Sequence, residues 1–245
     1  MPGPVALVGS GEYLAHMAPV EGSLLEAARL GGRPPRYVQI PTAATLEGEA
    51  SIARWVALGV EQAARLGVEA VPVVVRDRAD ADDPALAALV EGAGLVYLSG
   101  GSPTHCASTL RGTAVWEAVL AAWRGGAALA GCSAGAMSLT SWVPDLRHPS
   151  RSADPGLGVV PEVRVIPHFD KFAGWVPDII TRYLTRAPEG TAVVGVDEDT
   201  AVVWDDSAEG GGAWTVRGRQ SAWLLTRNGR VGHADGETIA LPSPG

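Results

Sequence analysis

Short apolar runs with little polar alternation recur along the first two thirds of the chain, and stretches with helical periodicity separate them. The runs predict β-strands at Val5–Val8, Tyr37–Ile40, Val71–Val75, Leu95–Leu98, 126–130 and 163–167. The stretches between them predict helices at Pro19–Leu30, 53–67, 83–90 and Thr113–Arg124. Strands that are apolar throughout and alternate with helices are typical of a parallel sheet covered on both faces. We therefore expect an α/β fold, a three-layer sandwich around a mostly parallel sheet.

The helix expected over 53–67 carries a specific prediction about its apolar side. Residues that recur at steps of three and four lie on one side of a helix, and here they are Ala53, Val56, Ala57, Val60 and Ala64. The apolar side of such a helix is the one that faces the core.

The pattern changes after residue 190, where short apolar runs follow one another without helices between them. These runs are Ala192–Val196, Ala201–Trp204, Trp214–Val216 and Ala222–Leu225, and turns such as Asn228-Gly229 follow them. We expect antiparallel strands over 190–245 that extend or close the sheet. Because the chain contains no linker rich in proline or serine, we treat residues 1–245 as a single domain.

The most informative motif is Gly131-Cys132-Ser133-Ala134-Gly135, which has the form G-x-S-x-G between an expected strand and a possible helix start. A sharp strand-to-helix turn needs small residues, and it holds a serine hydroxyl clear of the sheet as a nucleophile. The alternative is a tight turn whose serine only caps the helix.

A serine nucleophile needs a base, and the base needs a carboxylate to orient it. Among five histidines, His168 is the best placed, because it follows a predicted strand and so lies at the carboxyl end of the sheet. Asp145 and Asp154 lie between Ser133 and His168 and are the candidate acids, with Asp145 favoured. Glu162 begins the strand that leads to His168 and is expected at its far end.

An acyl-transfer reaction also needs two N–H donors for the oxyanion. The Ala134 N–H follows the nucleophile directly. The Gly101 N–H lies after the strand Leu95–Leu98, one helical crossover before the motif, so the two loops can be neighbours. The segment that starts at Gly9 resembles a dinucleotide-binding fingerprint but lacks its third glycine and its acidic residue, so we expect no cofactor.

Composition narrows the partners and the location. The net charge is −8 and no run of Lys or Arg occurs, which argues against nucleic acid. No stretch of about 18 apolar residues predicts a membrane span, and the first residues lack a signal-peptide pattern. The two cysteines, Cys106 and Cys132, are expected to be reduced, and no metal-binding motif occurs. These features favour a cytoplasmic protein.

Several segments, taken in order, resemble the cyanophycinase and dipeptidase E family of serine peptidases, whose fold is like the class I glutamine amidotransferase domain. They are 5–12, 40–43, 99–102, 131–136, 156–161, 167–169 and 195–201. The resemblance implies a nucleophile at Ser133, a base at His168 and an acid near Asp145. It places Ser102 near the substrate, where the family has Asn or Asp. Asp170-Lys171 departs from the cyanophycinase branch, which argues against cyanophycin as the substrate.

We therefore expect a serine hydrolase, an exopeptidase-like enzyme that cleaves a small peptide through a Ser-His-Asp triad and an acyl-enzyme, with a homodimer left possible. One alternative is a binding or regulatory module of the same fold whose site has decayed. Another is an α/β-hydrolase esterase, because Ser133, Asp205 and His233 occur in the chain order of that triad.

Overall fold

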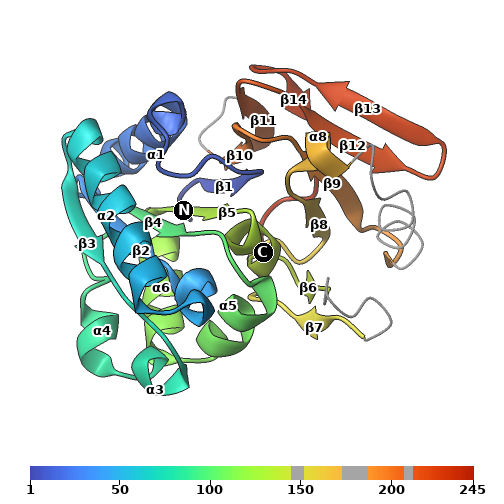
Figure 1. Cartoon of the computed structure of the whole chain (residues 1–245). Helices are drawn as coiled ribbons and strands as arrows, with labels where there is room; N and C mark the ends of the chain where they lie inside the picture. Colours follow the sequence, from blue (N-terminus) through green and yellow to red (C-terminus); the bar gives the residue numbers. More distant parts are fainter. Residues whose placement is uncertain (145–151, 173–186, 207–211) are drawn as a thin grey trace.

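The structure is a computed structural model of the chain, and it describes residues 1–144, 152–172, 187–206 and 212–245. Its main feature is an eight-stranded sheet with the order β14-β11-β10-β1-β5-β4-β2-β3 (Figure 1). The five parallel strands are β1 (Val5–Val8), β5 (Ala128–Cys132), β4 (Leu95–Leu98), β2 (Arg36–Ile40) and β3 (Glu69–Pro72). The expected α/β fold around a mostly parallel sheet is therefore confirmed.

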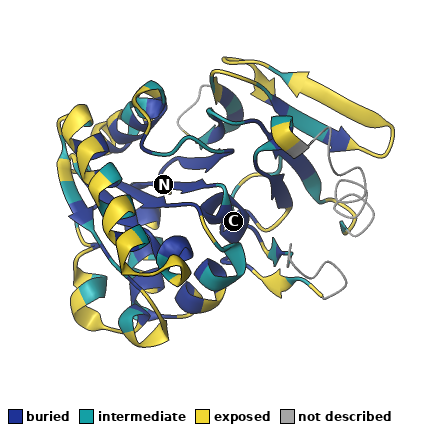
Figure 2. Ribbon diagram, in the orientation of Figure 1, coloured by how far each residue is buried: buried dark blue, intermediate teal, exposed yellow. Residues whose placement is uncertain are grey.

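Helices cover both faces of this sheet, and the strand residues divide between two cores. Val5 and Leu7 of β1 belong to the core under α5 (Pro103–Leu110), α6 (Ala114–Arg124) and α7 (Ala134–Ser138). Ala6 and Val8 belong to the core under α1 (Ala18–Leu30) and α2 (Glu49–Leu66). Figure 2 shows the buried central strands between helices whose outer sides are exposed. Strands buried on both faces explain why the sequence shows apolar runs rather than alternation.

The side of α2 that faces the core is not the side that the periodicity predicted. Ile52, Gly59 and Ala63 are buried, whereas Ala53 and Val60 are exposed. A Cβ at Gly59 would lie 1.3 Å from the side-chain oxygen of Gln39 on β2, so the glycine allows the helix to approach the sheet. The prediction of this face was wrong because it counted small apolar residues and did not recognise glycine as a close-contact position.

The strands after residue 190 do more than close one sheet. Three of them, β10 (Thr200–Asp205), β11 (Ala213–Gly218) and β14 (Thr238–Ile239), extend the main sheet antiparallel from β1. The other three are β9 (Ala192–Val196), β12 (Ala222–Thr226) and β13 (Gly229–His233), and they form a second sheet with β8 (Val163–Ile166). In this sheet β8 and β9 are parallel, so their carboxyl ends lie together.

Smaller elements complete the described part of the chain. They are the 3-10 helices η1 (Ala15–Met17) and η2 (Thr42–Glu47), the short helices α3 (Arg78–Ala81), α4 (Pro84–Ala88) and α8 (Phe169–Phe172), and the strand pair β6 (Trp142–Val143) and β7 (Asp154–Pro155). In the described residues, no helix has the length and apolar character that a membrane crossing requires.

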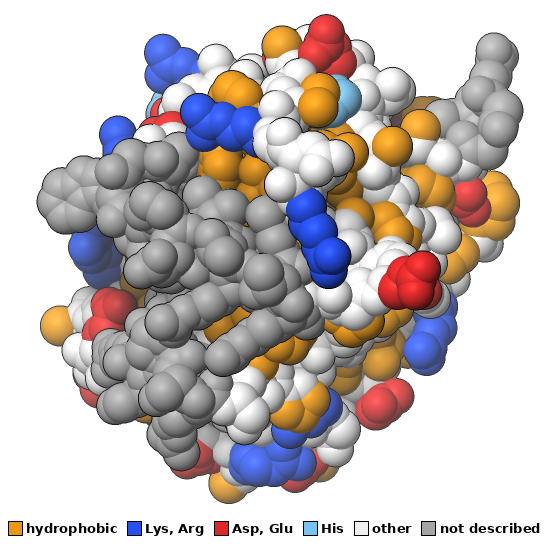
Figure 3. Space-filling view, turned by 90° about the vertical axis from the view of Figure 1, so that its right-hand side faces the viewer, with side chains coloured by type: hydrophobic (Ala, Val, Ile, Leu, Met, Phe, Trp, Pro, Cys, Tyr) orange, Lys and Arg blue, Asp and Glu red, His pale blue; other side chains and the backbone are white. Residues whose placement is uncertain are grey.

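The face that carries the second sheet mixes hydrophobic side chains with separate acidic and basic ones (Figure 3). Arg230 on β13 lies over two aromatic rings of this region, 4.6 Å from the centroid of Trp223 and 5.7 Å from that of Phe169. A guanidinium over a ring face is attracted by the ring's negative quadrupole, so Arg230 helps to fix the ring of Phe169. Phe169 matters because it follows His168 directly.

Candidate active site

Ser133 occupies a sharp turn between β5 and α7. Its backbone has a φ of 49° and a ψ of −107°, a conformation that L-residues rarely adopt. The two glycines of the motif make the turn possible. A Cβ at Gly131 would lie 2.5 Å from the backbone carbon of Gly135, and one at Gly135 would lie 2.3 Å from the carbonyl oxygen of Leu98. This is the geometry of a nucleophile elbow, which lifts the serine hydroxyl above the strand ends.

His168 meets Ser133 from the second sheet. It follows β8, and its Nε2 lies 3.0 Å from the Ser133 Oγ, within hydrogen-bond distance. His168 also has a left-handed backbone, with a φ of 50°. The next residue, Phe169, is 1% exposed, and its ring lies where a Cβ at Gly195 on β9 would be, 2.4 Å away. The buried ring therefore anchors the turn that carries the imidazole.

Glu198 completes a line of three polar groups. Its Oε1 lies 3.0 Å from the His168 Nδ1, on the opposite side of the ring from Ser133. The Glu198 backbone N–H donates to Asp170 Oδ1 at 2.9 Å, which fixes the loop between β9 and β10. A carboxylate at Nδ1 holds a proton there, so that Nε2 is free to accept the proton of a serine hydroxyl.

The neighbours of Glu198 are also held in place. Asp197 accepts hydrogen bonds from the indole N–H of Trp223 at 3.0 Å and from the Ser221 N–H at 3.2 Å, and burial raises its pKa. On the other side, Asp199 Oδ1 lies 2.9 Å from His16 Nε2. A loop fixed at three successive side chains presents Glu198 in one orientation.

The two acids predicted from the sequence, Asp145 and Asp154, have different outcomes. Asp145 falls outside the residues that the structure describes. Asp154 lies in the exposed strand β7, opposite Val143. Glu162 is exposed and precedes β8, so it lies at the end of that strand away from His168, as expected. Sequence reasoning missed Glu198 because it searched only between Ser133 and His168. The sequence does show an acidic triplet, 197–199, directly after the predicted strand Ala192–Val196, but it does not show the pairing with β8 that brings Glu198 to His168.

The turn between β4 and α5 lies against Ser133. A Cβ at Gly100 would be 3.6 Å from the Ser133 Cβ. The Gly100 N–H donates to Glu12 Oε1 at 2.9 Å, and the Ser102 N–H donates to the Ala43 carbonyl oxygen at 2.7 Å. The Gly101 N–H between them has no acceptor among the described residues.

Ala134 offers a second donor from the other side of the serine. Its N–H begins α7 and likewise has no acceptor within the described part of the chain. Amides without an acceptor in the two segments next to Ser133 are the kind of donor that an oxyanion hole requires, because it stabilises the charge that develops on an attacked carbonyl.

A model of peptidase family S51 matches residues 5–209. The chain belongs to peptidase family S51. The crystal structure of a peptidase from an acI-B1 Actinobacterium is similar to it over 98% of both chains, with 41% sequence identity and a TM-score of 0.89. The crystal structure of a putative peptidase E protein from Listeria monocytogenes EGD-e is similar over 90% of this chain and 100% of that one. The sequence identity is 16% and the TM-score is 0.61, which shows a shared fold. No curated protein matches the chain.

These findings confirm the resemblance that the sequence indicated, and they make the chain a serine-type peptidase. They leave the role of each site residue to be argued from geometry. A decayed S51 site would have no reason to keep both 3.0 Å contacts of His168, to Ser133 and to Glu198.

The esterase triad is incompatible with the sheet of this S51 peptidase. In the register of the main sheet, Val8 lies opposite both Cys132 and Ala201, whereas Val5 lies opposite both Leu129 and Trp204. Ser133 therefore lies at one end of the strands and Asp205 at the other. At about 3.3 Å per residue, the two are separated by roughly 16 Å along the strand direction. That hypothesis was wrong because chain order does not fix which end of a strand a residue occupies.

Ser102 has a structural task at the site. Its Oγ accepts the N–H of His105 at 3.3 Å and so caps α5. Its predicted contact with substrate stays a prediction.

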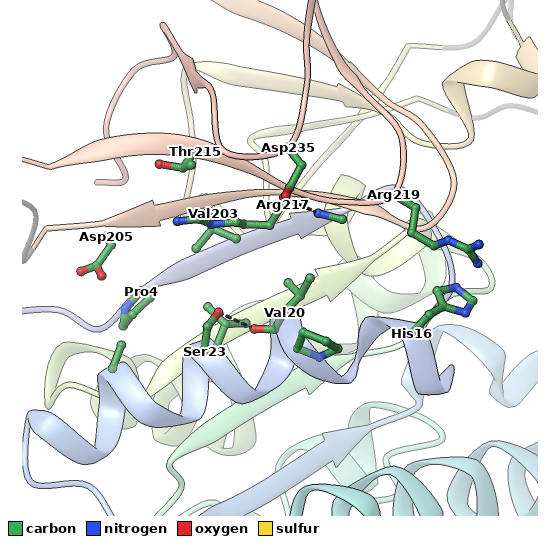
Figure 4. Close-up of a pocket in the computed structure, with 14 residues that line it drawn as sticks. Pro4, His16, Val20, Ser23, Val203, Asp205, Thr215, Arg217, Arg219 and Asp235 are labelled. Carbon is green, nitrogen blue, oxygen red and sulfur yellow. Dashed lines mark hydrogen bonds between the residues drawn. The ribbon is translucent and has the colours of Figure 1, made fainter.

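A separate cavity of about 480 Å³ lies between α1 and the strands β10 and β11 (Figure 4). Its lining includes His16, Arg217, Arg219 and Asp235 but none of Ser133, His168 and Glu198. Figure 4 shows Arg219 and His16 at the same end of this cavity. The Arg219 N–H also donates to the carbonyl oxygen of Asp199 at 2.9 Å, so one wall of the cavity supports the loop that carries Glu198.

Proposed function

We propose that this S51 peptidase hydrolyses a short peptide through an acyl-enzyme formed on Ser133. His168 Nε2 takes the proton of the serine hydroxyl as Oγ attacks the carbonyl carbon, and it then gives that proton to the leaving amine. Water then attacks the acyl carbon while His168 takes its proton, and the proton passes to Ser133 Oγ as the acid product leaves. The observation that carries the proposal is the unbroken line from Ser133 Oγ through His168 to Glu198, with both contacts at 3.0 Å.

In this proposal Glu198 takes the role that the sequence assigned to Asp145. Its carboxylate holds the imidazole tautomer and stabilises the imidazolium that forms during attack. The N–H groups of Gly101 and Ala134 bind the oxyanion. Removal of one such donor, a side chain, costs about 3 kcal/mol of transition-state stability in one known serine hydrolase.

The test is labelling with a fluorophosphonate probe, which reacts with activated serines. We expect labelling of the wild type at Ser133, none in Ser133→Ala, and normal labelling in Ser141→Ala. Ser141 is a matched control, because it is an exposed serine whose Oγ bonds the Pro161 carbonyl oxygen. Labelling that survives in Ser133→Ala would refute the proposed nucleophile.

The exopeptidase part of the proposal concerns the ends of the substrate. A panel of dipeptides and tripeptides, including aspartyl and β-aspartyl ones, is compared with the same peptides acetylated at the amino terminus. An exopeptidase that requires a free amino terminus loses turnover on acetylation. Equal turnover of free and acetylated peptides, or preference for internal bonds of long peptides, would contradict it.

We also infer a cytoplasmic location, because Cys106 and Cys132 are both free and fully buried. Cell fractionation tests this inference, and recovery of the protein outside the cell would overturn it. The homodimer stays a prediction that light scattering in solution can test.

A further inference from the structure

Glu12 connects three segments that meet at the serine elbow. It follows β1, and its Oε1 accepts the N–H of Gly100 at 2.9 Å. Its Oε2 accepts the thiol of Cys132 at 2.8 Å, and Cys132 directly precedes Ser133. One carboxylate thus joins the end of β1, the glycine turn after β4 and the end of β5. Figure 1 shows these three strands side by side in the sheet.

The turn that carries Glu12 is held in an unusual conformation. Gly11 has a φ of 88° and Tyr13 has a φ of 64°. A side chain at Gly11 would meet Asp199 Oδ1, which lies 2.4 Å from its Cβ position. A left-handed tyrosine persists only where its surroundings enforce it. Tyr13 is 3% exposed, with its ring centroid 5.5 Å from that of Tyr97. This buried ring directs Glu12 toward Gly100.

Cys132 acts here as a donor. Burial raises the pKa of its thiol well above the usual range, and the charge of Glu12 raises this pKa further, so the thiol keeps its proton. A protonated thiol donates to a carboxylate, and it is a poor nucleophile. The two donors, one from Cys132 and one from Gly100, together satisfy both oxygens of Glu12.

We propose that Glu12 is a positioning residue that sets the oxyanion hole by fixing the Gly100-Gly101 turn. A glycine pair has more conformational freedom than any other dipeptide, so it needs external contacts to present one N–H in one direction. The turn is held on one side by Ala43, which accepts the Ser102 N–H, and on the other by Glu12, which accepts the Gly100 N–H. Without Glu12 the second contact is lost, and the Gly101 N–H no longer points steadily at the reacting oxygen.

This inference rests on the proposed function, because an oxyanion hole has meaning only for a nucleophilic Ser133. It also assigns Glu12 a role through hydrogen bonds rather than through charge. A carboxylate near a developing oxyanion gives no electrostatic benefit of its own, so a neutral side chain of the same shape can replace it.

The experiment measures the rate at which a fluorophosphonate labels Ser133 in variants of the full chain. Glu12→Ala removes both acceptor oxygens, and we expect labelling at least tenfold slower than in the wild type. Glu12→Gln keeps the length and one acceptor oxygen for Gly100, and we expect a rate within threefold of the wild type. Glu117→Ala is the matched control, an exposed glutamate on α6 that is expected to keep the wild-type rate.

A second measurement follows the turn itself. Hydrogen exchange of the segment 95–102 should quicken in Glu12→Ala and stay slow in Glu12→Gln, because only the alanine leaves the Gly100 N–H without an acceptor. Should Glu12→Ala fail to fold, Glu12→Asp takes its place. The shorter acid keeps the charge but cannot reach Gly100 and Cys132 together, so slow labelling is again expected.

The outcomes separate the two proposals. A wild type that is labelled at Ser133, together with Glu12→Ala labelled at the same rate, overturns the role of Glu12 and leaves the proposed function standing. Equal slowing in Glu12→Gln and Glu12→Ala also overturns it, because charge would then be the effective property. A wild type without any labelling at Ser133 overturns the proposed function itself.

Discussion

Replacing Glu21 by glutamine is expected to stabilise the protein at pH 8 and to change its stability little at pH 5. Glu21 lies on α1 with 1% of its surface exposed. Its Oε2 accepts the hydroxyl of Tyr37 at 3.0 Å, while its Oε1 is buried without a partner among the described residues. Burial raises the pKa of this carboxyl from 4.5 to about 7, and the nearby polar groups of Gln62 and Tyr37 only partly oppose the rise.

The sign follows from proton binding. Because the folded pKa is raised, the folded state holds the proton more tightly than the unfolded state does. The stability that Glu21 contributes is therefore complete below pH 4.5 and is lost as the pH rises through 7. The folded pKa exceeds the unfolded one by 7 − 4.5, about 2.5, and at about 1.4 kcal/mol per pKa unit the full loss is about 3.5 kcal/mol, of which about 3 kcal/mol is reached at pH 8. The glutamine that replaces Glu21 has no proton to lose, so the variant avoids this loss.

Thermal unfolding at pH 5 and pH 8 measures the effect. For a chain of this length, a change of about 3 kcal/mol raises Tm by roughly 8 °C, and this gain should be seen at pH 8 and largely vanish at pH 5. The comparison of variant with wild type at each pH removes the contribution of all other titrating groups. Glu26→Gln, an exposed position on the same helix, is the control and should leave Tm nearly unchanged at both values. A Tm difference that does not depend on pH would refute the reasoning.

Three further predictions concern the site. Glu198→Gln keeps the shape but not the charge at His168 Nδ1, so kcat should fall by roughly 10²–10⁴-fold with Tm unchanged, and a loss below tenfold in a turnover assay would contradict its role. Gly195→Ala places a methyl group against the Phe169 ring, so chemical denaturation should show a loss of about 1–3 kcal/mol together with lost activity, and a silent substitution would count against the ring as an anchor. Ser102→Ala removes the cap of α5 and should cost about 1 kcal/mol of stability. If Ser102 contacts the substrate as the sequence predicts, KM should also rise, and an unchanged KM would contradict that contact.

Most of the central sheet was predictable because its strands are buried on both faces and read as continuous apolar runs. The helix α5 was not predicted, since Thr104, His105 and Ser108 are poor helix formers and only its cap and packing sustain it. Four of the described strands after residue 190 were predicted, whereas β13 and β14 were not. The division of these strands between two sheets depends on pairing that the sequence pattern does not show.

The candidate site shows the same limit. Ser133 and His168 were recognised from local signals, a glycine-flanked turn and a strand end, and the structure brings them to 3.0 Å. Glu198 was not, because its place beside His168 follows from the parallel pairing of β8 with β9, which no local pattern encodes. A carboxylate that acts across two loops can be found only after the topology is known.

The residues of the candidate active site come from both sheets. Ser133 and both N–H donors follow strands of the main sheet, and His168 follows β8 of the second sheet. Glu198 lies in the loop that passes from β9 of the second sheet to β10 of the main sheet. The sheets touch closely at Gly9, where a Cβ would lie 2.1 Å from the Asp197 carbonyl oxygen. Any sliding between them would alter the contact between His168 and Ser133, because these two residues follow strands of different sheets. Turnover by this peptidase therefore depends on how the two sheets are docked, and not only on whether each sheet is folded.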